Sequence, residues 1–280
     1  MMIKNRSKNN NILNPILIVL LILLGSESIS AQEVEDEREF EYAEKSEKGP
    51  RKWGEMKKEW GACSNGSLQS PVDISNDRVI IMSKQEKKIH YRPSNASLKN
   101  RGHDIQIQWF GEAGSIFING TDYPLRQAHW HSPSEHTING RSYDMELHLV
   151  HLSTDPNVKN KIAVLGVLYK IGKPDKFLSK LMRNITSMTD KKHEEKAVGM
   201  IDPADIKLHS KRYYRYMGSL TVPPCTEGVI WTINKKVKSV SRDQVKSLRE
   251  AVHDYAEKNA RPLQAKHNRD MYLYSTGNAN

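Results

Sequence analysis

The spacing of three histidines constrains the fold of this chain more than any other feature of its sequence. His129 and His131 are separated by one residue in the segment QAHWH, and His148 follows in MELHLVH. Side chains at positions i and i+2 of a β-strand point to the same face, so His129 and His131 can reach one ion while Trp130 points away. A third ligand must then come from a neighbouring strand, which requires a β-sheet.

The turn that would bring this neighbouring strand alongside is Asn139-Gly140. The dipeptide suits a two-residue hairpin because both central residues of a type I′ turn have positive φ. In an uninterrupted hairpin, residues equidistant from the turn would pair, which places His131 opposite His148. Pro133 cannot donate to a hydrogen-bonded ladder, so the register can shift between them. The sequence therefore predicts that the histidines are neighbours and leaves their exact pairing open.

Three imidazoles with no fourth protein ligand are typical of a catalytic zinc ion, which keeps water at its fourth position, and not of a closed structural site. Two polar residues share the strand faces of these ligands: Gln127 lies two positions before the first histidine, and Glu146 two before the third. Each is placed to accept the second ring proton of a ligand and so fix its tautomer. A single histidine on a strand is commonly an ordinary core or surface residue, so the prediction of Zn²⁺ depends on the whole set.

Short runs of alternating apolar and polar residues dominate the rest of the chain and predict a mainly β domain. These runs cover residues 104–110, 115–118, 161–171 and 228–234. Helical patterns are fewer: one covers residues 175–185, and another starts at Ser241, where Gln244 suits a capping box. The chain has no internal repeat or obvious inner linker, so we expect one domain with one substantial core.

At the histidine motifs the chain resembles the alpha class of carbonic anhydrases. The segments QAHWH, SEHT, ELHLVH and GSLTVPPC occur in the order and approximate spacing of that family, between about Trp53 and about Leu263, and KWGEMKKEWGACSNGSLQSPVDI is similar to its secreted plant members. The resemblance implies a single domain with a large twisted, mostly antiparallel central sheet and a few peripheral helices, with the metal at the base of a cone-shaped cleft. It also implies reversible hydration of carbon dioxide to bicarbonate and a proton, by attack of zinc-bound hydroxide.

The resemblance further implies roles for individual residues. Thr221 would orient the hydroxide after giving its own hydroxyl proton to Glu135. His103 would relay protons to the buffer, which suits a side chain with a pKa near neutrality. From the sequence alone, Glu135 and Thr221 would be interpreted as structural, and His103 is one of 11 histidines. The carbon dioxide pocket would be formed by Val150, Val164, Leu220, Thr221, Val222 and Trp231.

Three positions depart from what is frequent in the family. Val222 stands where many members have a second threonine, Glu55 where many animal members have tyrosine, and Arg126 where an apolar residue is frequent. These changes alter the water network and the pocket rim, so turnover, ester hydrolysis and inhibitor affinity stay open. His136 and His151 are expected to be structural.

Two other functions fit parts of this pattern. A noncatalytic storage or binding protein on the same fold would be expected to have lost a ligand or the pair of Glu135 and Thr221, and this chain keeps them. A zinc hydrolase acting on esters would be expected to have a carboxylate ligand or a roomier pocket. We therefore predict a carbonic anhydrase, a zinc lyase that acts on carbon dioxide and bicarbonate.

Residues 1–31 predict a secretory signal peptide. Lys4, Arg6 and Lys8 form a positive start, an apolar run covers residues 16–24, and small residues follow it. A retained membrane anchor is the alternative, but the run is short for a bilayer, so no stable membrane span is expected after cleavage. The product would enter the secretory pathway, and its destination stays open between the cell wall and the plastid.

The arm that follows, residues 32–48, is acidic and has little apolar content, so it is expected to be flexible. The domain is expected at residues 49–280. The whole chain has a formal net charge of +10, which could attract acidic polymers but more often reflects a solvated face. No dense run of Lys and Arg interleaved with aromatic residues is present, which argues against nucleic-acid binding. We expect a monomer or a weak oligomer.

Cys63 and Cys225 are the two cysteines of the chain. In an oxidising compartment an even number favours a disulfide bond, and two buried free thiols are the alternative. Secreted plant members of the family have a bridge at matching positions. Asn119 lies in a predicted turn with Gly120, where the tight geometry could hinder glycosylation. Four sequons could accept glycans in that compartment: Asn65, Asn95, Asn119 and Asn184.

Overall fold

The computed structural model describes residues 39–83, 87–189, 191, 193–208, 210–252 and 256–275. All of them belong to one compact unit, as expected for a single domain. The predicted signal peptide and the first residues of the arm lie outside this described part of the chain. No helix within these ranges is both long enough and apolar enough to cross a membrane.

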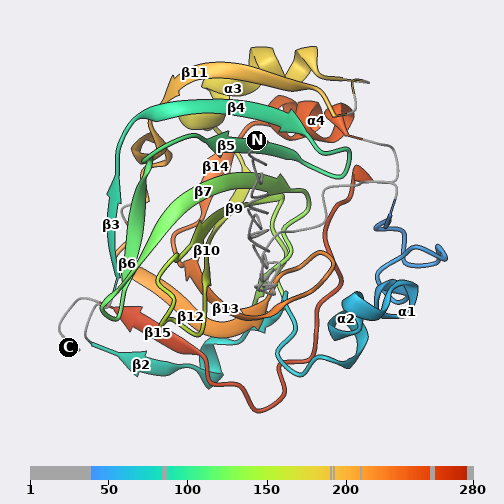
Figure 1. Cartoon of the computed structure of the whole chain (residues 1–280), viewed down its shortest axis with the longest axis vertical. Helices are drawn as coiled ribbons and strands as arrows, with labels where there is room; N and C mark the ends of the chain where they lie inside the picture. The colour runs from blue at the N-terminus through green and yellow to red at the C-terminus, as the bar shows by residue number, and fades with distance from the viewer. Residues whose placement is uncertain are drawn as a thin grey trace, which may run out of the picture. The chain divides into compact units, whose positions relative to one another are not determined.

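A large mixed β-sheet forms the framework (Figure 1). Its main path runs in the order β11-β4-β5-β7-β9-β10-β13-β12-β15-β2, and β3, β6 and β14 pair off this path. The strands are β1 (Asp73–Ile74), β2 (Ile80–Met82), β3 (Lys87–Tyr91), β4 (Ser94–Asn100), β5 (Ile105–Trp109), β6 (Gly114–Ile118), β7 (Thr121–His131), β8 (Thr137–Ile138), β9 (Met145–Leu152), β10 (Ile162–Ile171), β11 (Glu195–Ile201), β12 (Arg212–Ser219), β13 (Glu227–Asn234), β14 (Lys238–Val240) and β15 (Tyr272–Ser275).

Most strand pairs are antiparallel, as expected. The parallel pairs are β10 with β13 and with β14, β15 with β2, and β1 with β8. Helices are few, and α3 and α4 pack together at one edge of the sheet (Figure 1). The α-helices are α1 (Trp53–Met56), α2 (Ala62–Asn65), α3 (Lys176–Ser187) and α4 (Arg242–Ala251), and the 3₁₀ turns are η1 (Lys58–Trp60), η2 (Asn76–Arg78) and η3 (Pro203–Ile206).

The two faces of β9 divide the core. Leu147 and Leu149 lie in the largest apolar cluster, which also contains the buried apolar residues of α3 and α4. Val150 lies in a second cluster on the other face, which it shares with His148 by the two-residue alternation of a strand. The predicted metal site is therefore on the face of the sheet opposite the main core.

Two aromatic side chains within the arm that was expected to be flexible are buried. Phe40 is 0% exposed and Tyr42 is 5% exposed. Both pack with Trp53 in a third apolar cluster, and the Trp53 indole N–H donates to the carbonyl oxygens of Lys48, at 2.9 Å, and Glu41, at 3.2 Å. The excess of acidic residues hid two aromatic side chains that bury enough surface to order this segment. The compact domain therefore begins before residue 49.

The predicted hairpin turn is present. Asn139 and Gly140 have positive φ angles of 52° and 73°, and Ile138 and Arg141 form a β-bridge across them. The strand before the turn, β8, is short. It pairs with β1 and does not continue β7. The turn therefore closes a small hairpin that extends from the histidine strands.

The pairing of His131 with His148 that an uninterrupted hairpin would give does not occur, and the register differs from it by two residues. The ladder between β7 and β9 places His129 opposite His148 and His131 opposite Glu146. Pro133 has no N–H to donate, and the chain leaves the ladder after β7 before it reaches the turn. The register therefore cannot be counted from the turn, although the histidines are neighbours as expected.

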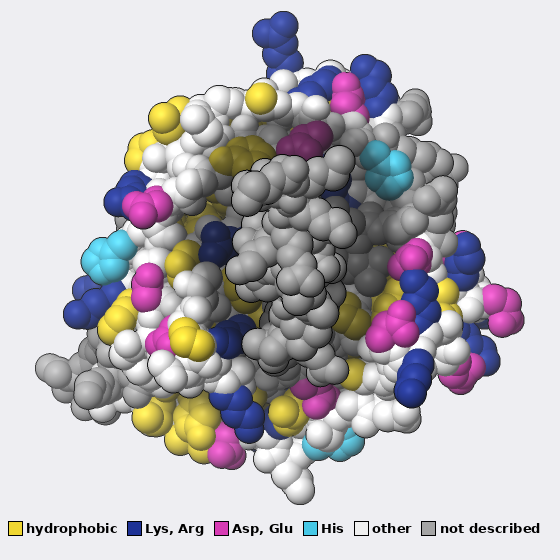
Figure 2. Space-filling model, in the orientation of Figure 1, with side chains coloured by type: hydrophobic (Ala, Val, Ile, Leu, Met, Phe, Trp, Pro, Cys, Tyr) yellow, Lys and Arg dark blue, Asp and Glu magenta, His cyan; other side chains and the backbone are white. Residues whose placement is uncertain are grey.

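Basic and acidic side chains are interspersed on the face of the molecule shown in Figure 2, and no large block of one sign is visible among the described residues there. This distribution is that of a solvated surface, in spite of the net charge of +10.

Candidate metal centre

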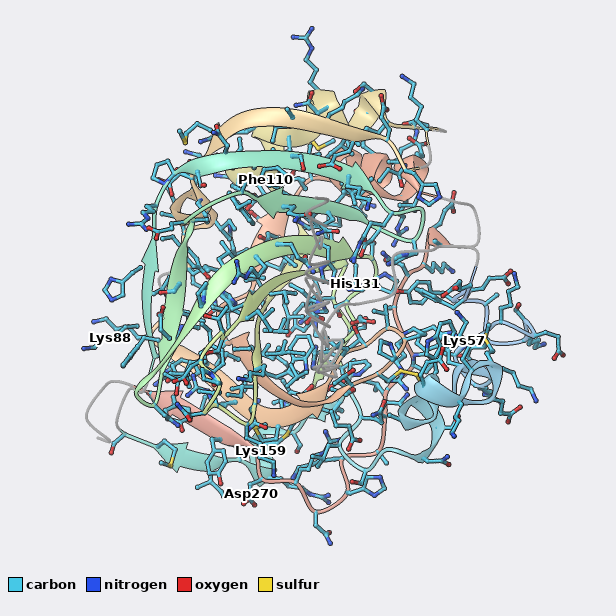
Figure 3. All side chains as sticks on the ribbon, viewed as in Figure 1. Lys57, Lys88, Phe110, His131, Lys159 and Asp270 are labelled. Atoms are coloured by element: carbon cyan, nitrogen blue, oxygen red, sulfur yellow. A yellow bond between two sulfur atoms is a disulfide. The ribbon has the colours of Figure 1, made fainter. Side chains whose placement is uncertain are left out.

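The three predicted ligands converge. His129 and His131 project from the end of β7, and His148 projects from β9. The ring centroids are 5.0 Å apart for His129 and His131, 5.2 Å for His129 and His148, and 4.6 Å for His131 and His148. One nitrogen of each ring lies within 4.8 Å of the other two, and all three residues are buried. Figure 3 shows His131 in the interior, where β7 ends.

Hydrogen bonds fix the tautomer of each ring. Each ligand donates one ring N–H to an oxygen that carries no proton: His129 Nδ1 to Gln127 Oε1 at 2.8 Å, His131 Nδ1 to the backbone carbonyl of Asn259 at 2.7 Å, and His148 Nε2 to Glu146 Oε1 at 2.9 Å. This leaves the lone pairs on His129 Nε2, His131 Nε2 and His148 Nδ1 for a metal ion.

His131 Nε2 provides a test of whether a metal fits. This atom is buried and has no hydrogen-bond partner among the described residues. A buried polar nitrogen without a partner is costly, and a bound cation would satisfy it. Burial holds the pKa of His129 well below its usual value, which favours the neutral ring that a metal requires. Three imidazole ligands suit zinc, so the residues fit the predicted ion.

Glu146 links the ligands to a buried network. Its Oε2 accepts the backbone N–H groups of Glu135, at 3.0 Å, and His136, at 2.8 Å, and its Oε1 also accepts from His136 Nδ1 at 2.8 Å. Burial alone would raise the pKa of Glu146, but the imidazoles of His136 and His148 hold it well below its usual value. The carboxylate is therefore ionised and acts as a fixed acceptor.

His136 and Tyr216 extend this network beyond Glu146 and act as structural supports. His136 Nε2 accepts from the Tyr216 hydroxyl at 2.6 Å, and that hydroxyl lies 2.8 Å from Ser70 Oγ.

Opposite His148 on β10 is Gly166, where an added Cβ would lie 2.5 Å from Ile233 Cδ1 and 3.1 Å from Glu146 Oε1. A larger residue at position 166 would therefore press on the support of His148.

Glu135 lies next to the ligands, but it is not joined to Thr221. The Glu135 side chain is fully buried, with Oε1 3.7 Å from His131 Nδ1. Oε1 accepts the backbone N–H of Arg261 at 2.9 Å, and Oε2 lies 4.0 Å from His148 Nε2 but has no hydrogen-bond partner among the described residues. Thr221 is 3% exposed, and none of the hydrogen bonds found in the described ranges joins its hydroxyl to Glu135. Glu135 Oε2, the expected acceptor, is therefore available. The Thr221 hydroxyl, the expected donor, is buried but forms no hydrogen bond with it among the described residues.

The loop that carries Thr221 is held at both ends. Its backbone is closed by hydrogen bonds from Leu220 N to Thr226 O, at 3.0 Å, and from Cys225 N to Val222 O, at 2.8 Å. The predicted disulfide is present and joins Cys225 to Cys63, 162 residues earlier. The bridge therefore ties the loop after β12 to α2.

His103 does not lie on the surface. Its side chain is 0% exposed, and its ring centroid lies 5.0 Å from that of Phe40. His103 Nε2 is 3.7 Å from Asp104 Oδ2. The same aromatic residue that orders the arm therefore packs against the residue expected to relay protons.

The predicted pocket residues separate into two groups. Val150, Val164, Leu220 and Trp231 share one buried apolar cluster, and the Trp231 ring centroid lies 4.8 Å from that of His148. Val222 lies instead in the cluster of Phe40 and the disulfide. The structure therefore brings four of the expected apolar residues together on the face that carries His148.

Two residues of the C-terminal segment, residues 259–271, support the site without any signal in the sequence. Asn259 holds His131 through its backbone carbonyl, and its side chain accepts from Ser132 N at 2.8 Å and donates to the carbonyls of His103 and Trp130, at 2.9 and 3.1 Å. Arg261 holds Glu135 through its backbone N–H. No spacing or periodicity signals these contacts, because both key groups are backbone atoms that any residue has.

The predicted sequons lie at different exposures. Asn184 is partly exposed, on α3. Asn119 has a φ angle of 48° in the turn between β6 and β7. Exposed side chains are those of Asn65, Asn95 and Asn119.

Comparisons with known proteins agree with this geometry. The family model of eukaryotic-type carbonic anhydrases matches residues 48–275. Carbonic anhydrase Nec1 of Nesocodon mauritianus is 55% identical over 258 residues, which is 92% of this chain and 93% of that protein. Alpha carbonic anhydrase 7 of Arabidopsis thaliana is 51% identical over 258 residues, which is 92% of each.

Among solved structures, dioscorin complexed with ascorbate is similar with a TM-score of 0.82 and 40% identity, over 86% of this chain and 100% of that one. The alpha carbonic anhydrase of Thermovibrio ammonificans, solved with the inhibitor sulfanilamide, has a TM-score of 0.75 and 34% identity, over 83% of this chain and 98% of that one.

Proposed function

This chain belongs to the alpha class of carbonic anhydrases, and we propose that it hydrates carbon dioxide reversibly to bicarbonate and a proton at a zinc ion held by His129, His131 and His148. The observation that carries the proposal is the convergence of three buried rings whose second nitrogens are already hydrogen-bonded. Zinc bound there would lower the pKa of its water to about 7, the value established for carbonic anhydrases.

The residues around the ligands supply orientation and a dry niche. Gln127, Glu146 and the carbonyl of Asn259 hold each ring in one tautomer, so that each presents a single lone pair. Carbon dioxide has no strong hydrogen-bonding group, so it needs only a small apolar space beside the reacting atoms. We assign this space to the cluster of Val150, Val164, Leu220 and Trp231.

Thr221 and Glu135 would orient the nucleophile. In our proposal the Thr221 hydroxyl donates to Glu135 Oε2, the carboxylate oxygen that has no hydrogen-bond partner in the described part of the chain. With its proton directed there, the hydroxyl oxygen can only accept a hydrogen bond from the nucleophile. The Glu135 carboxylate is held for this purpose by the backbone N–H of Arg261, at 2.9 Å.

His103 is our candidate for proton export, and its contact with Phe40 means that the ring must swing out to reach the buffer. In His103→Ala, carbon dioxide hydration at low buffer concentration should fall about tenfold or more and recover when imidazole is added. Hydration kinetics at several buffer concentrations check this. An unchanged rate at low buffer would remove His103 from the mechanism.

A storage or binding function is the second candidate, because dioscorin, solved with ascorbate, is 40% identical to this chain. The chain retains all three ligands and Glu135 in a buried, preorganised arrangement, which supports the catalytic function instead. The disulfide supports an oxidising compartment, and we propose that the protein follows the secretory pathway to the cell wall or to the plastid. We propose a monomer or a weak oligomer.

The decisive experiment compares His148→Ala with His90→Ala, a change at an exposed histidine on β3. Wild type and His90→Ala should contain one zinc ion per chain and hydrate carbon dioxide. In His148→Ala, the zinc content should fall and hydration should drop by about a thousandfold or more, because one of the three ligands is lost. Zinc analysis and stopped-flow hydration assays measure both. A wild type that binds stoichiometric zinc without hydration would refute the catalytic proposal and favour the storage function.

A further inference from the structure

A second pocket, of about 460 Å³, lies between the start of α3, the end of η3 and the ends of β10 and β13. We call it the lysine pocket, because five lysines line it: Lys170, Lys176, Lys207, Lys236 and Lys238. None of its lining residues belongs to the metal centre. Its volume is within the range of small-molecule sites in proteins.

The charge of the lysine pocket is largely uncompensated. Its two acidic residues are already paired, Asp175 with Lys238 at 2.7 Å and Asp205 with Lys180 at 2.5 Å. Within the described ranges, the ammonium groups of the other four lysines form no ion pair and no hydrogen bond. All four are exposed, so the pocket presents four solvated cations around one cavity.

Asn234 gives an independent sign that the pocket is built for a ligand. It lines the pocket at the end of β13 and is 3% exposed. Its Oδ1 is buried and has no partner in the described part of the chain. A buried amide left without partners costs about 1–3 kcal/mol, so such groups usually serve a ligand or a bound water. Rotation of the side-chain amide would place its two N–H donors at the position of Oδ1.

We propose that the lysine pocket binds a compact phosphate compound with several negative charges, such as a diphosphate or a phosphate ester. Lysine ammonium groups bind phosphate oxygens as point charges, and a diphosphate group concentrates its charge within a cavity of this size. Asn234 would donate to a phosphate oxygen. Lys176 is the first residue of α3, so the positive end of the helix dipole adds to the attraction.

Inorganic pyrophosphate is the probe, measured by isothermal titration calorimetry at near-physiological ionic strength. Wild type should bind one pyrophosphate per chain, Lys170→Ala/Lys236→Ala should weaken binding about tenfold or more, and Asn234→Ala should weaken it severalfold. The matched control is Lys88→Ala/Lys159→Ala, which removes the same charge from exposed positions outside the pocket (Figure 3). Thermal unfolding of each variant confirms that it is folded. The assay does not depend on carbon dioxide hydration.

Three results would overturn the proposal. The first is the absence of saturable binding to wild type. The second is equal weakening in the control variant, which would show that net charge alone attracts the anion. The third is equally tight binding of citrate or sulfate, which would show that the pocket does not select phosphate.

Discussion

The histidine strands β7 and β9 and the C-terminal segment both hold the metal centre, but they use different chemical groups. The strands contribute side chains: three ligands and two of the oxygens that fix their tautomers. The C-terminal segment, which has no helix or strand at residues 259–266, contributes the backbone carbonyl of Asn259 and the backbone N–H of Arg261. Regular strands therefore bring the ligands together and orient two of the rings, and an irregular segment more than a hundred residues away holds His131 and Glu135.

Arg261→Met tests the irregular C-terminal segment. Its expected effect on the free energy of unfolding is the largest of these predictions. The guanidinium is buried and donates to Gln69 Oε1 and to the carbonyls of Ser70 and Cys63 at 2.8–2.9 Å. Burial lowers the pKa of Arg261 to about 10, so it still carries its charge at neutral pH. Methionine would leave three buried acceptors without donors, and the free energy of unfolding should fall by about 4 kcal/mol.

The measurement for Arg261→Met is denaturant unfolding beside Arg183→Met, a change at an exposed arginine on α3 that should alter stability by less than about 0.5 kcal/mol. The backbone N–H that holds Glu135 is unchanged in Arg261→Met, so the folded protein should keep most of its hydration activity. A stability equal to that of the control would show that the C-terminal segment is held by other contacts.

Part of the fold could be predicted because it depends on side-chain patterns. The alternating runs matched β5, β6, β10 and β13, and the capping box between Ser241 and Gln244 is present with both of its hydrogen bonds. The register of β7 on β9 could not be predicted in this way. It depends on where the chain leaves the ladder after His131 and not on the turn.

The arm and the C-terminal segment were hidden for different physical reasons. Phe40 and Tyr42 stand among charges, and their contribution lies in a cluster with distant residues such as Trp53. Asn259 acts on His131 through a carbonyl, a group present in every residue, so no residue type could mark the position. Backbone contacts made across the chain depend on tertiary structure and leave no local sequence signal.

A matched pair of variants, Gln127→Ala and Asn259→Ala, distinguishes support of a ligand by a side chain from support by the backbone. Gln127→Ala removes the acceptor of His129 itself, so zinc affinity should fall about 10- to 100-fold with little loss of stability. Asn259→Ala keeps the carbonyl that holds His131 but removes bonds to the backbone of Ser132, Trp130 and His103. Its stability should fall by about 2–3 kcal/mol, with a smaller change in zinc affinity.

Competition with a chelator gives the zinc affinities, and denaturant unfolding of the metal-free proteins gives the stabilities. If Asn259→Ala lost as much zinc affinity as Gln127→Ala and no stability, the side chain of Asn259 would act on the metal directly. The distinction between side-chain and backbone support would then fail.

The smallest expected effect concerns His151, on the face of β9 opposite the ligands. Its Nε2 accepts from the Tyr91 hydroxyl at 2.7 Å, and its Nδ1 donates to the carbonyl of Ala163 at 3.1 Å. Burial lowers the pKa of His151 to about 4, whereas the unfolded chain should protonate it near the ordinary value of 6.5. Between these values the unfolded state binds the proton and the folded state does not, so stability falls as the pH falls from about 6.5 towards 4.

From pH 7 to pH 5, His151 should therefore remove about 2 kcal/mol from the free energy of unfolding. In Tyr91→Phe/His151→Phe this part of the pH dependence should disappear, because both partners of the bond are replaced together by apolar rings. Denaturant unfolding of the metal-free proteins at the two pH values measures it, with His90→Gln as the exposed control. The metal ligands are the same in all three proteins, so only the difference between them reports on His151. An identical pH dependence in all three would mean that His151 can be protonated in place, and that this face of β9 is as open to solvent as the surface.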